Sequence, residues 1–146
     1  MIVLVKIYRT DDRKIHEEEE LTEGVWVQMV NPSEGEGEEY ARKLDVDITD
    51  LLAALDEEES SRIELEDGYT LILVDIPSIE ERSGKDWYVT IPLGIITTEE
   101  AIITVCLEET PILAAFMDGR VKDFHTYMKT RFILQILYKN ASLFLQ

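Results

Sequence analysis

The chain has 146 residues, 45% of them hydrophobic, which suits one compact domain with a buried core and leaves little room for a second. Its 31 acidic and 14 basic side chains give a formal net charge of -17, and such a surface repels phosphate backbones and anionic lipid headgroups. Nucleic acid is therefore disfavoured as a partner, whereas metal cations or a basic protein are favoured.

Cysteine content and hydrophobicity also restrict the class of protein. Cys106 is the single cysteine, so an internal disulfide is impossible, and the start of the chain carries no signal-peptide pattern. Both features favour the reducing cytoplasm. No apolar run approaches the roughly 18 to 20 residues of a membrane helix, so we expect a soluble chain.

Two strands are predicted before the first helix. Met1–Tyr8 is a short apolar run and is predicted to be an outer strand of the sheet. The acidic run Glu17–Glu20 follows and is interpreted as a flexible loop. Gly24–Val30 alternates in side-chain character, as a strand does, and Asn31-Pro32-Ser33 ends it.

Two helices are predicted next, each with its own start signal. Ser33 and Glu36 have the spacing of a capping box, which predicts a helix through Leu44. Asp47 is a suitable cap for a second helix, whose apolar residues recur at helical spacing. These are Ile48, Leu51, Leu52 and Leu55.

The centre of the chain, Arg62–Val105, predicts the main sheet. Asp67-Gly68 favours a tight turn that pairs Ile63–Glu66 with Tyr69–Ile76, and a polar break then precedes a second apolar run. Thr98-Glu99-Glu100 predicts another turn before Ala101–Leu107. Because the middle strands are apolar on both faces, they need cover on both sides, and helices are the expected cover.

The carboxyl end predicts two more helices. Thr110-Pro111 is a strong helix start, and Asp118-Gly119 is the expected stop. From Asp123 one helix is predicted to the end of the chain. Its part from Phe132 to Leu145 is apolar in almost every direction, which requires burial on several sides. We therefore expect that the chain continues in a longer protein or that this helix meets a partner.

The order of these features resembles one known family. The features are Trp26 with Asn31-Pro32, a Ser/Glu-rich helix, the segment Ile48–Pro77, then Tyr88–Val105 and a closing helix. The most specific parts are Leu55-Asp56 with Glu59–Ile63, and Pro92–Ile96 leading to Ile103–Val105. From about Glu23 to its end, the chain resembles the cytoplasmic amino-terminal domain of the CorA family of magnesium and divalent-cation transporters.

The resemblance implies an α/β fold, an α/β/α layered sandwich whose mixed, largely antiparallel central sheet is covered by helices. Residues 1–119 would form a cytoplasmic regulatory domain, and residues 120–146 would begin the helical region that leads towards the stalk. The resemblance also implies a funnel-shaped homopentamer of identical subunits, in which this domain lies on the cytoplasmic side of the membrane. Intracellular magnesium between neighbouring domains keeps their channel closed. The chain has no Gly-Met-Asn motif and no membrane helices, so sensing and assembly, without conduction, are the expected functions.

A regulatory cation site is expected among carboxylates, because Mg2+ is a hard cation that is often held through one or two of them. The resemblance places Ala53 where the family has an aspartate. Asp50, Asp56 and Glu57 are the nearest carboxylates and are the predicted contacts for regulatory Mg2+ or another divalent cation. No catalytic cofactor is expected.

Simpler interpretations stand beside these predictions. Asp56–Glu59 also fits a solvated charge run at a helix end, since Asp and Glu are seldom buried. His16 and His125 have no partner at ligand spacing, and Cys106 fits a small core residue. Trp26 and Trp87 are expected to pack. Asp75, within an apolar strand, is either buried with a partner or at an exposed margin of the sheet.

Two other function classes remain open. An enzyme would need a cluster of ligands or an acid and a base, and the chain shows no HExxH, phosphate-binding glycine loop, nucleophile elbow or triad pattern. A free-standing acidic interaction domain that docks through its apolar C-terminal helix fits the composition. A gene that continues past Gln146 into a long helix, a Gly-Met-Asn sequence and two apolar runs would distinguish the transporter.

Overall fold

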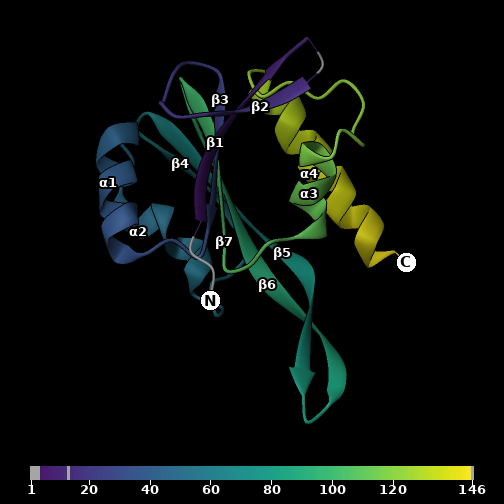
Figure 1. Ribbon diagram of the computed structural model, residues 1–146. Coiled ribbons are helices and arrows are strands. Elements are labelled where there is room, and N and C mark those ends of the chain that lie inside the picture. The colour runs from purple at the N-terminus through teal and green to yellow at the C-terminus, as the bar shows by residue number, and fades with distance from the viewer. Residues whose placement is uncertain (1–3, 13, 146) are drawn as a thin grey trace.

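The computed structural model describes residues 4–12 and 14–145 as a sheet with helices on both faces (Figure 1). The predicted α/β/α sandwich is therefore confirmed. The strands are β1 (Leu4–Asp11), β2 (Lys14–Glu18), β3 (Val25–Val30), β4 (Arg62–Glu66), β5 (Tyr69–Arg82), β6 (Lys85–Thr98) and β7 (Ala101–Cys106). The helices are α1 (Glu34–Leu44), α2 (Ile48–Leu51), the 3-10 turn η1 (Ala53–Leu55), α3 (Pro111–Met117) and α4 (Lys129–Phe144).

The seven strands have the order β2-β1-β3-β7-β6-β5-β4. Neighbouring strands are antiparallel except β3 and β7, which pair in parallel, so the sheet is mixed and largely antiparallel as predicted. The Asp67-Gly68 turn pairs β4 with β5, and Thr98–Glu100 connects β6 to β7, both as expected. β4 is one edge of the sheet, and its outer side has no strand neighbour among the described residues.

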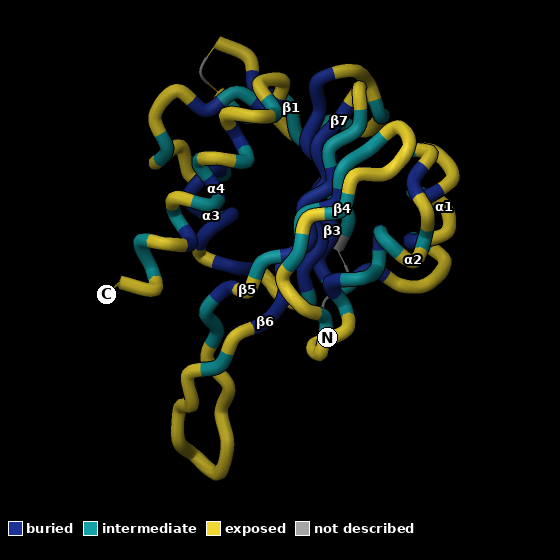
Figure 2. Tube along the Cα trace, turned by 180° about the vertical axis from the view of Figure 1, so that it is seen from behind, coloured by how far each residue is buried: buried dark blue, intermediate teal, exposed yellow. Residues whose placement is uncertain are grey.

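Alternate residues of the central strands bury both faces, because successive side chains of a strand point in opposite directions. On the face covered by α1, α2 and η1, the core contains Val27, Met29 and Leu73 together with Leu51 and Ala54 of the helical layer. Buried positions run along the central strands in Figure 2.

An aromatic cluster forms the core of the other face, which α3 and α4 cover. Trp26 packs against Phe124 and Phe132, with ring centroids 6.1 and 5.1 Å away, and Phe116 packs against both phenylalanines. The Trp26 indole Nε1 donates to Thr104 Oγ1 at 2.9 Å, so its one polar atom is satisfied inside the core. The prediction that Trp26 packs is confirmed.

Local capping signals correctly located the starts of three helices. Ser33 and Glu36 form a reciprocal capping box at α1, Asp47 Oδ1 accepts from Thr49 N at the start of α2, and Thr110 caps α3. The second predicted helix is short, since the chain passes from α2 into η1 at Leu52. The turn η1 can lie close to β6 because Gly94 has no side chain: a Cβ there would be 3.2 Å from Ala54 Cβ.

The amino-terminal predictions were partly wrong. Lys14–Glu18 forms the edge strand β2, so the expected flexible loop at Glu17–Glu20 is half strand. β1 is consequently not an outer strand: it lies between β2 and β3. β2 was not predicted, because Ile15 is its only apolar residue. Charged side chains are common on edge strands, where they protect the sheet from aggregation. The predicted strand residues 1–3 lie outside the described residues.

The polar break predicted after Ile76 is instead a continuation of the β5–β6 hairpin. The two strands pair as far as Arg82 and Lys85, and Ser83 and Gly84 make the turn with φ of 53° and 78°. The end of the hairpin, Ile79–Tyr88, is exposed at every residue and projects from the body (Figures 1 and 2). We call this segment the arm. Trp87, which was expected to pack, is 51% exposed on the arm, where the Arg82 guanidinium lies over its ring at 5.7 Å.

The last helix begins at Lys129, later than the predicted Asp123. Asp123 has a left-handed backbone, with φ of 55°, which turns Phe124 into the aromatic cluster. Thr126 then hydrogen-bonds to Thr10 and to the Gly24 carbonyl, so this segment is tied to the sheet before α4 starts. These tertiary contacts override the helical pattern.

Candidate metal centre

Three carboxylates from different elements meet beside the α1 face of the sheet. Asp50 lies on α2, and Glu64 and Glu66 lie on β4; one carboxylate oxygen of each falls within 4.8 Å of the others. Glu64 and Glu66 share a side of the strand because they are two residues apart. Asp50 and Glu64 are half-buried, and Glu66 is exposed. This group is the Asp50–Glu64–Glu66 cluster.

Tyr69, the first residue of β5, fixes Asp50 in place. The Asp67-Gly68 turn pairs Tyr69 directly with Glu66. Its hydroxyl donates to Asp50 Oδ2 and accepts from the backbone N of Asp47 at 3.3 Å. Burial of the phenol, followed by its hydrogen bond to Asp50, raises the pKa of Tyr69 to about 12, although the Asp47 amide acts in the opposite direction. Tyr69 therefore remains a neutral donor to Asp50 at physiological pH.

Arg62 supplies positive charge at one side of the cluster. Its Nε donates to Glu64 Oε1 at 2.6 Å, and its Nη1 donates to Glu59 and to the Ser60 carbonyl. The hydrogen bonds to Glu59 and then to Glu64 raise the pKa of Arg62 above its ordinary value. With one guanidinium beside three carboxylates, the cluster keeps an excess of negative charge.

A cavity of about 570 Å³ adjoins Asp50. Its polar lining contains four acidic residues and Arg62; the acidic residues are Glu34, Asp50, Asp56 and Glu59. The Asp56 carboxylate accepts from the backbone N of Glu58, two residues further along the chain, at 3.0 Å, and Glu57 is exposed. The structure thus brings Asp50 together with Glu64 and Glu66, and Asp56 joins Asp50 only as part of the cavity wall.

The donor set fits a hard divalent cation. Carboxylate oxygens are the ligands that Mg2+ and Ca2+ prefer, and Mg2+ usually keeps several of its waters. Opposed ligands of Mg2+ lie about 4.1 Å apart, so oxygens within 4.8 Å of one another could contact the ion or its bound water after small side-chain movements. Asp50, Glu64 and Glu66 are the residues that would hold such an ion.

Glu64 and Glu66 were missed in the sequence, although a signal was present. The predicted pairing of Ile63–Glu66 with Tyr69–Ile76 already placed both glutamates on one side of a strand, with Tyr69 opposite Glu66. The contact of that side with Asp50 depends on how α2 packs over the sheet, which no local pattern shows.

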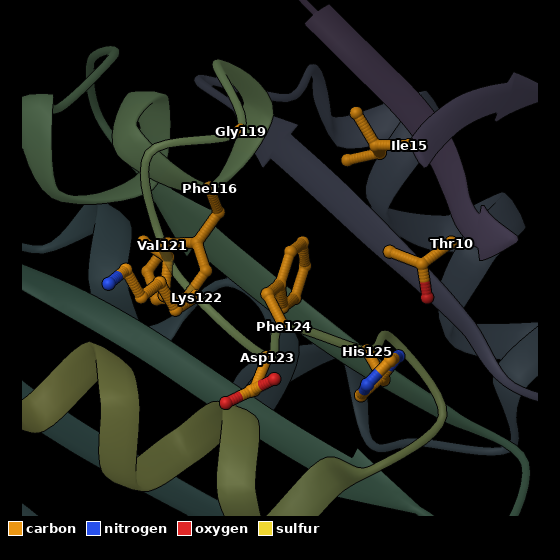
Figure 3. Close-up of a pocket in the computed structure, with 9 residues that line it drawn as sticks. All are labelled: Thr10, Ile15, Phe116, Gly119, Val121, Lys122, Asp123, Phe124 and His125. Carbon is orange, nitrogen blue, oxygen red and sulfur yellow. The ribbon is translucent and has the colours of Figure 1, made fainter. Parts of the chain in front are cut away.

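A second cavity, of about 560 Å³, lies between β1, β2 and the segment that follows α3 (Figure 3). The buried rings of Phe116 and Phe124 line it, and Asp123 and His125 contribute polar groups. Asp123 also pairs with Arg131 at 3.7 Å. The cavity is therefore a crevice of mixed polar and apolar lining, and Asp123 is the one carboxylate among its lining residues.

Two residues left open by the sequence can now be placed. Cys106 is 1% exposed, its Sγ lies 3.6 Å from the Pro92 carbonyl oxygen, and burial raises the pKa of its thiol to about 11. It is a core residue, as predicted. Asp75 is exposed at the margin of the sheet, and its backbone carbonyl accepts from Asn140 Nδ2 at 3.0 Å.

Comparison with known proteins identifies the family. The model of the family described as CorA-like Mg2+ transporter protein matches residues 22–144, so the chain belongs to this family. No curated protein matches the chain. The family match confirms the resemblance inferred from the sequence.

Solved structures share the fold at low sequence identity. The soluble domain of CorA from Methanocaldococcus jannaschii is 21% identical with a TM-score of 0.76, over 97% of this chain and 58% of that one. The complete CorA magnesium transporter from the same organism is 17% identical with a TM-score of 0.75, over 97% of this chain and 46% of that one. The ZntB cytoplasmic domain from Vibrio parahaemolyticus is 11% identical with a TM-score of 0.68, over 99% of this chain and 62% of that one.

The chain therefore spans about half the length of the CorA structures that it matches. Within residues 4–12 and 14–145, no helix is long and apolar enough to cross a membrane.

Proposed function

We propose that this chain is the regulatory, ion-sensing domain of a CorA-like transporter for Mg2+ or another divalent cation. The family match over residues 22–144 carries the proposal, and the Asp50–Glu64–Glu66 cluster supports it. In the whole protein the domain would lie on the cytoplasmic side of the membrane. Residues 1–119 would form the regulatory domain, and residues 120–146 would lead towards a stalk. No enzymatic activity is proposed.

The proposed mechanism is electrostatic. Identical subunits of a homopentamer would place acidic surfaces next to one another, and each chain carries a net charge of -17. A divalent cation would neutralise facing carboxylates and stabilise the closed assembly, whereas loss of the ion would leave like charges repelling. Asp50, Asp56 and Glu57 remain proposed contacts of this ion, and the cluster adds Glu64 and Glu66.

Calorimetric titration of the chain with MgCl2 tests the proposed site. Asp50→Asn and Glu64→Gln each remove one charged ligand and should weaken binding by at least about tenfold, since even second-shell changes cost that much. Glu38→Gln is the matched control, because Glu38 is an exposed carboxylate on α1 outside the cluster. Equal binding by all of these variants would exclude the cluster as the site.

A second candidate function has one specific observation in its favour. α4 exposes Leu134 and Tyr138, at 61% and 75%, and Leu145, which follows the helix, is 88% exposed. An acidic interaction domain that docks through this helix would use that surface. Tyr138→Ser would weaken such docking but leave Mg2+ binding unchanged. A chain that binds no Mg2+ by calorimetry would favour the docking function over ion sensing.

A further inference from the structure

Arg62 binds one of the candidate ligands of the Asp50–Glu64–Glu66 cluster. Its Nε donates to Glu64 Oε1 at 2.6 Å. Arg62, Glu64 and Glu66 alternate along β4 and therefore lie on one side of the strand, where Asp50 meets them. The guanidinium thus occupies an oxygen of a carboxylate that a bound cation would also use.

A second set of contacts holds the guanidinium independently of Glu64. Arg62 Nη1 donates to the Glu59 carboxylate and to the Ser60 carbonyl oxygen, which is 3.2 Å away. Both acceptors belong to the segment between η1 and β4. Because these contacts use a different nitrogen from the one that binds Glu64, Arg62 can release Glu64 and still remain beside the cluster.

The pair of Arg62 with Glu64 is less exposed than a similar pair on the arm. The side chains of Arg62 and Glu64 are 33% and 34% exposed, whereas those of Arg82 and Glu80 are 55% and 50% exposed. Arg82 Nε also donates to a glutamate two residues away, at 2.9 Å. Since water screens charges less at a partly buried site, the charge of Arg62 acts more strongly on its surroundings than that of Arg82.

A cation at Glu64 would lie close to this guanidinium. Mg2+ binds oxygen at about 2.1 Å, so the ion and Arg62 Nε would be at most about 7 Å apart even with one on each oxygen of Glu64. This distance is below the screening length of about 8 Å at physiological ionic strength. The two positive charges therefore repel each other, and release of Glu64 by Arg62 relieves that repulsion.

We propose that Arg62 is a built-in competitor of the cation at the Asp50–Glu64–Glu66 cluster. Its guanidinium binds Glu64 when no ion is bound, and a divalent cation takes over that carboxylate while Arg62 stays attached to Glu59 and Ser60. The inference rests on the proposed function, because it concerns the regulation of the same site. The consequence is weaker binding, which suits a sensor, since the site must release its ion when the concentration falls.

Calorimetric titration with MgCl2 tests the competition. Arg62→Met keeps a long side chain but removes the positive charge, so this variant should bind Mg2+ about tenfold or more tightly than wild type. Arg82→Met makes the same change of net charge on the arm, outside the cluster, and should bind as wild type does. Arg62→Met combined with Asp50→Asn should lose the gain, because the tighter binding occurs at the cluster.

A structural role of Arg62 predicts the opposite sign. If the guanidinium only held Glu64 in a geometry that favours the ion, its removal would weaken Mg2+ binding. Equal or weaker binding by Arg62→Met, with wild type binding Mg2+, would therefore overturn the inference and leave the proposed function standing. Circular dichroism checks that each variant is folded.

The Nε–H proton of Arg62 follows the exchange of partners in the wild-type chain by NMR. Its hydrogen bond to Glu64 should slow exchange of this proton with water in EDTA, and saturating MgCl2 should remove the protection, whereas NaCl of equal ionic strength should not. Arg62→Lys identifies the resonance because it deletes it. The Nε–H of Arg82, bonded to Glu80, is the internal control and should respond alike to both salts. Protection that persists in MgCl2, in a chain that binds Mg2+, would overturn the exchange.

The calorimetric outcomes separate this inference from the proposed function. Equal affinities of wild type and Arg62→Met for Mg2+ would remove only the competitor. Binding by Arg62→Met without detectable binding by wild type would support a strong competitor. No binding by either chain would overturn ion sensing at the cluster and the competitor with it.

Discussion

Tyr69 connects the backbone of α2, the Asp50 carboxylate and the hairpin that carries Glu66. Its side chain spans these elements because the Asp67-Gly68 turn places it opposite Glu66 and its hydroxyl reaches Asp50 and the Asp47 amide. This residue therefore positions the candidate ligand Asp50.

The pH dependence of stability tests this role. The pKa of Tyr69 is raised from 10.0 to about 12 in the folded chain, so the neutral phenol stabilises the fold fully below about pH 10. This contribution is lost as the pH rises through 12. Tyr69→Phe should remove that part of the alkaline loss of stability, measured by urea unfolding between pH 9 and about 12. Tyr138→Phe, at a 75% exposed position, is the control and should leave it unchanged.

Among the helices and strands, the sequence predicted the elements whose stabilising contacts are local. Ser33 and Glu36 interact within one turn, and Asp67-Gly68 sets the hairpin register without help from the rest of the chain. β2 and the start of α4 were missed, because pairing with β1 and burial of Phe124 decide them. Asp50 was named from the resemblance, whereas its partners on β4 depend on packing between layers.

The close packing of η1 on β6 predicts how a substitution at Gly94 changes the stability of the fold. Gly94→Ala would bring a methyl group to 3.2 Å from Ala54 Cβ, and neither group can rotate away. The change should lower the free energy of unfolding by about 1–3 kcal/mol, measured by urea denaturation. Gly35→Ala is the matched substitution, because no atom lies within 4 Å of the added Cβ. It should stabilise α1 by up to about 1 kcal/mol, and equal losses for both would contradict the packing argument.

For the whole molecule, dissolved salt screens the repulsion that arises from the net charge of -17, and this effect does not require a binding site. A binding site differs from screening in that it depends on particular side chains. Ion sensing therefore requires an effect of Mg2+ that exceeds that of sodium at equal ionic strength and that disappears with the Asp50–Glu64–Glu66 cluster.

The most direct test is the thermal midpoint of the chain in MgCl2 and in NaCl of equal ionic strength, for wild type, Asp50→Asn and Glu38→Gln. We predict an additional rise in MgCl2 for wild type and Glu38→Gln, corresponding to about 2.7 kcal/mol at a hundredfold excess over Kd. Asp50→Asn should respond alike to both salts. The same additional rise in Asp50→Asn, or none in wild type, would contradict cation sensing at this cluster.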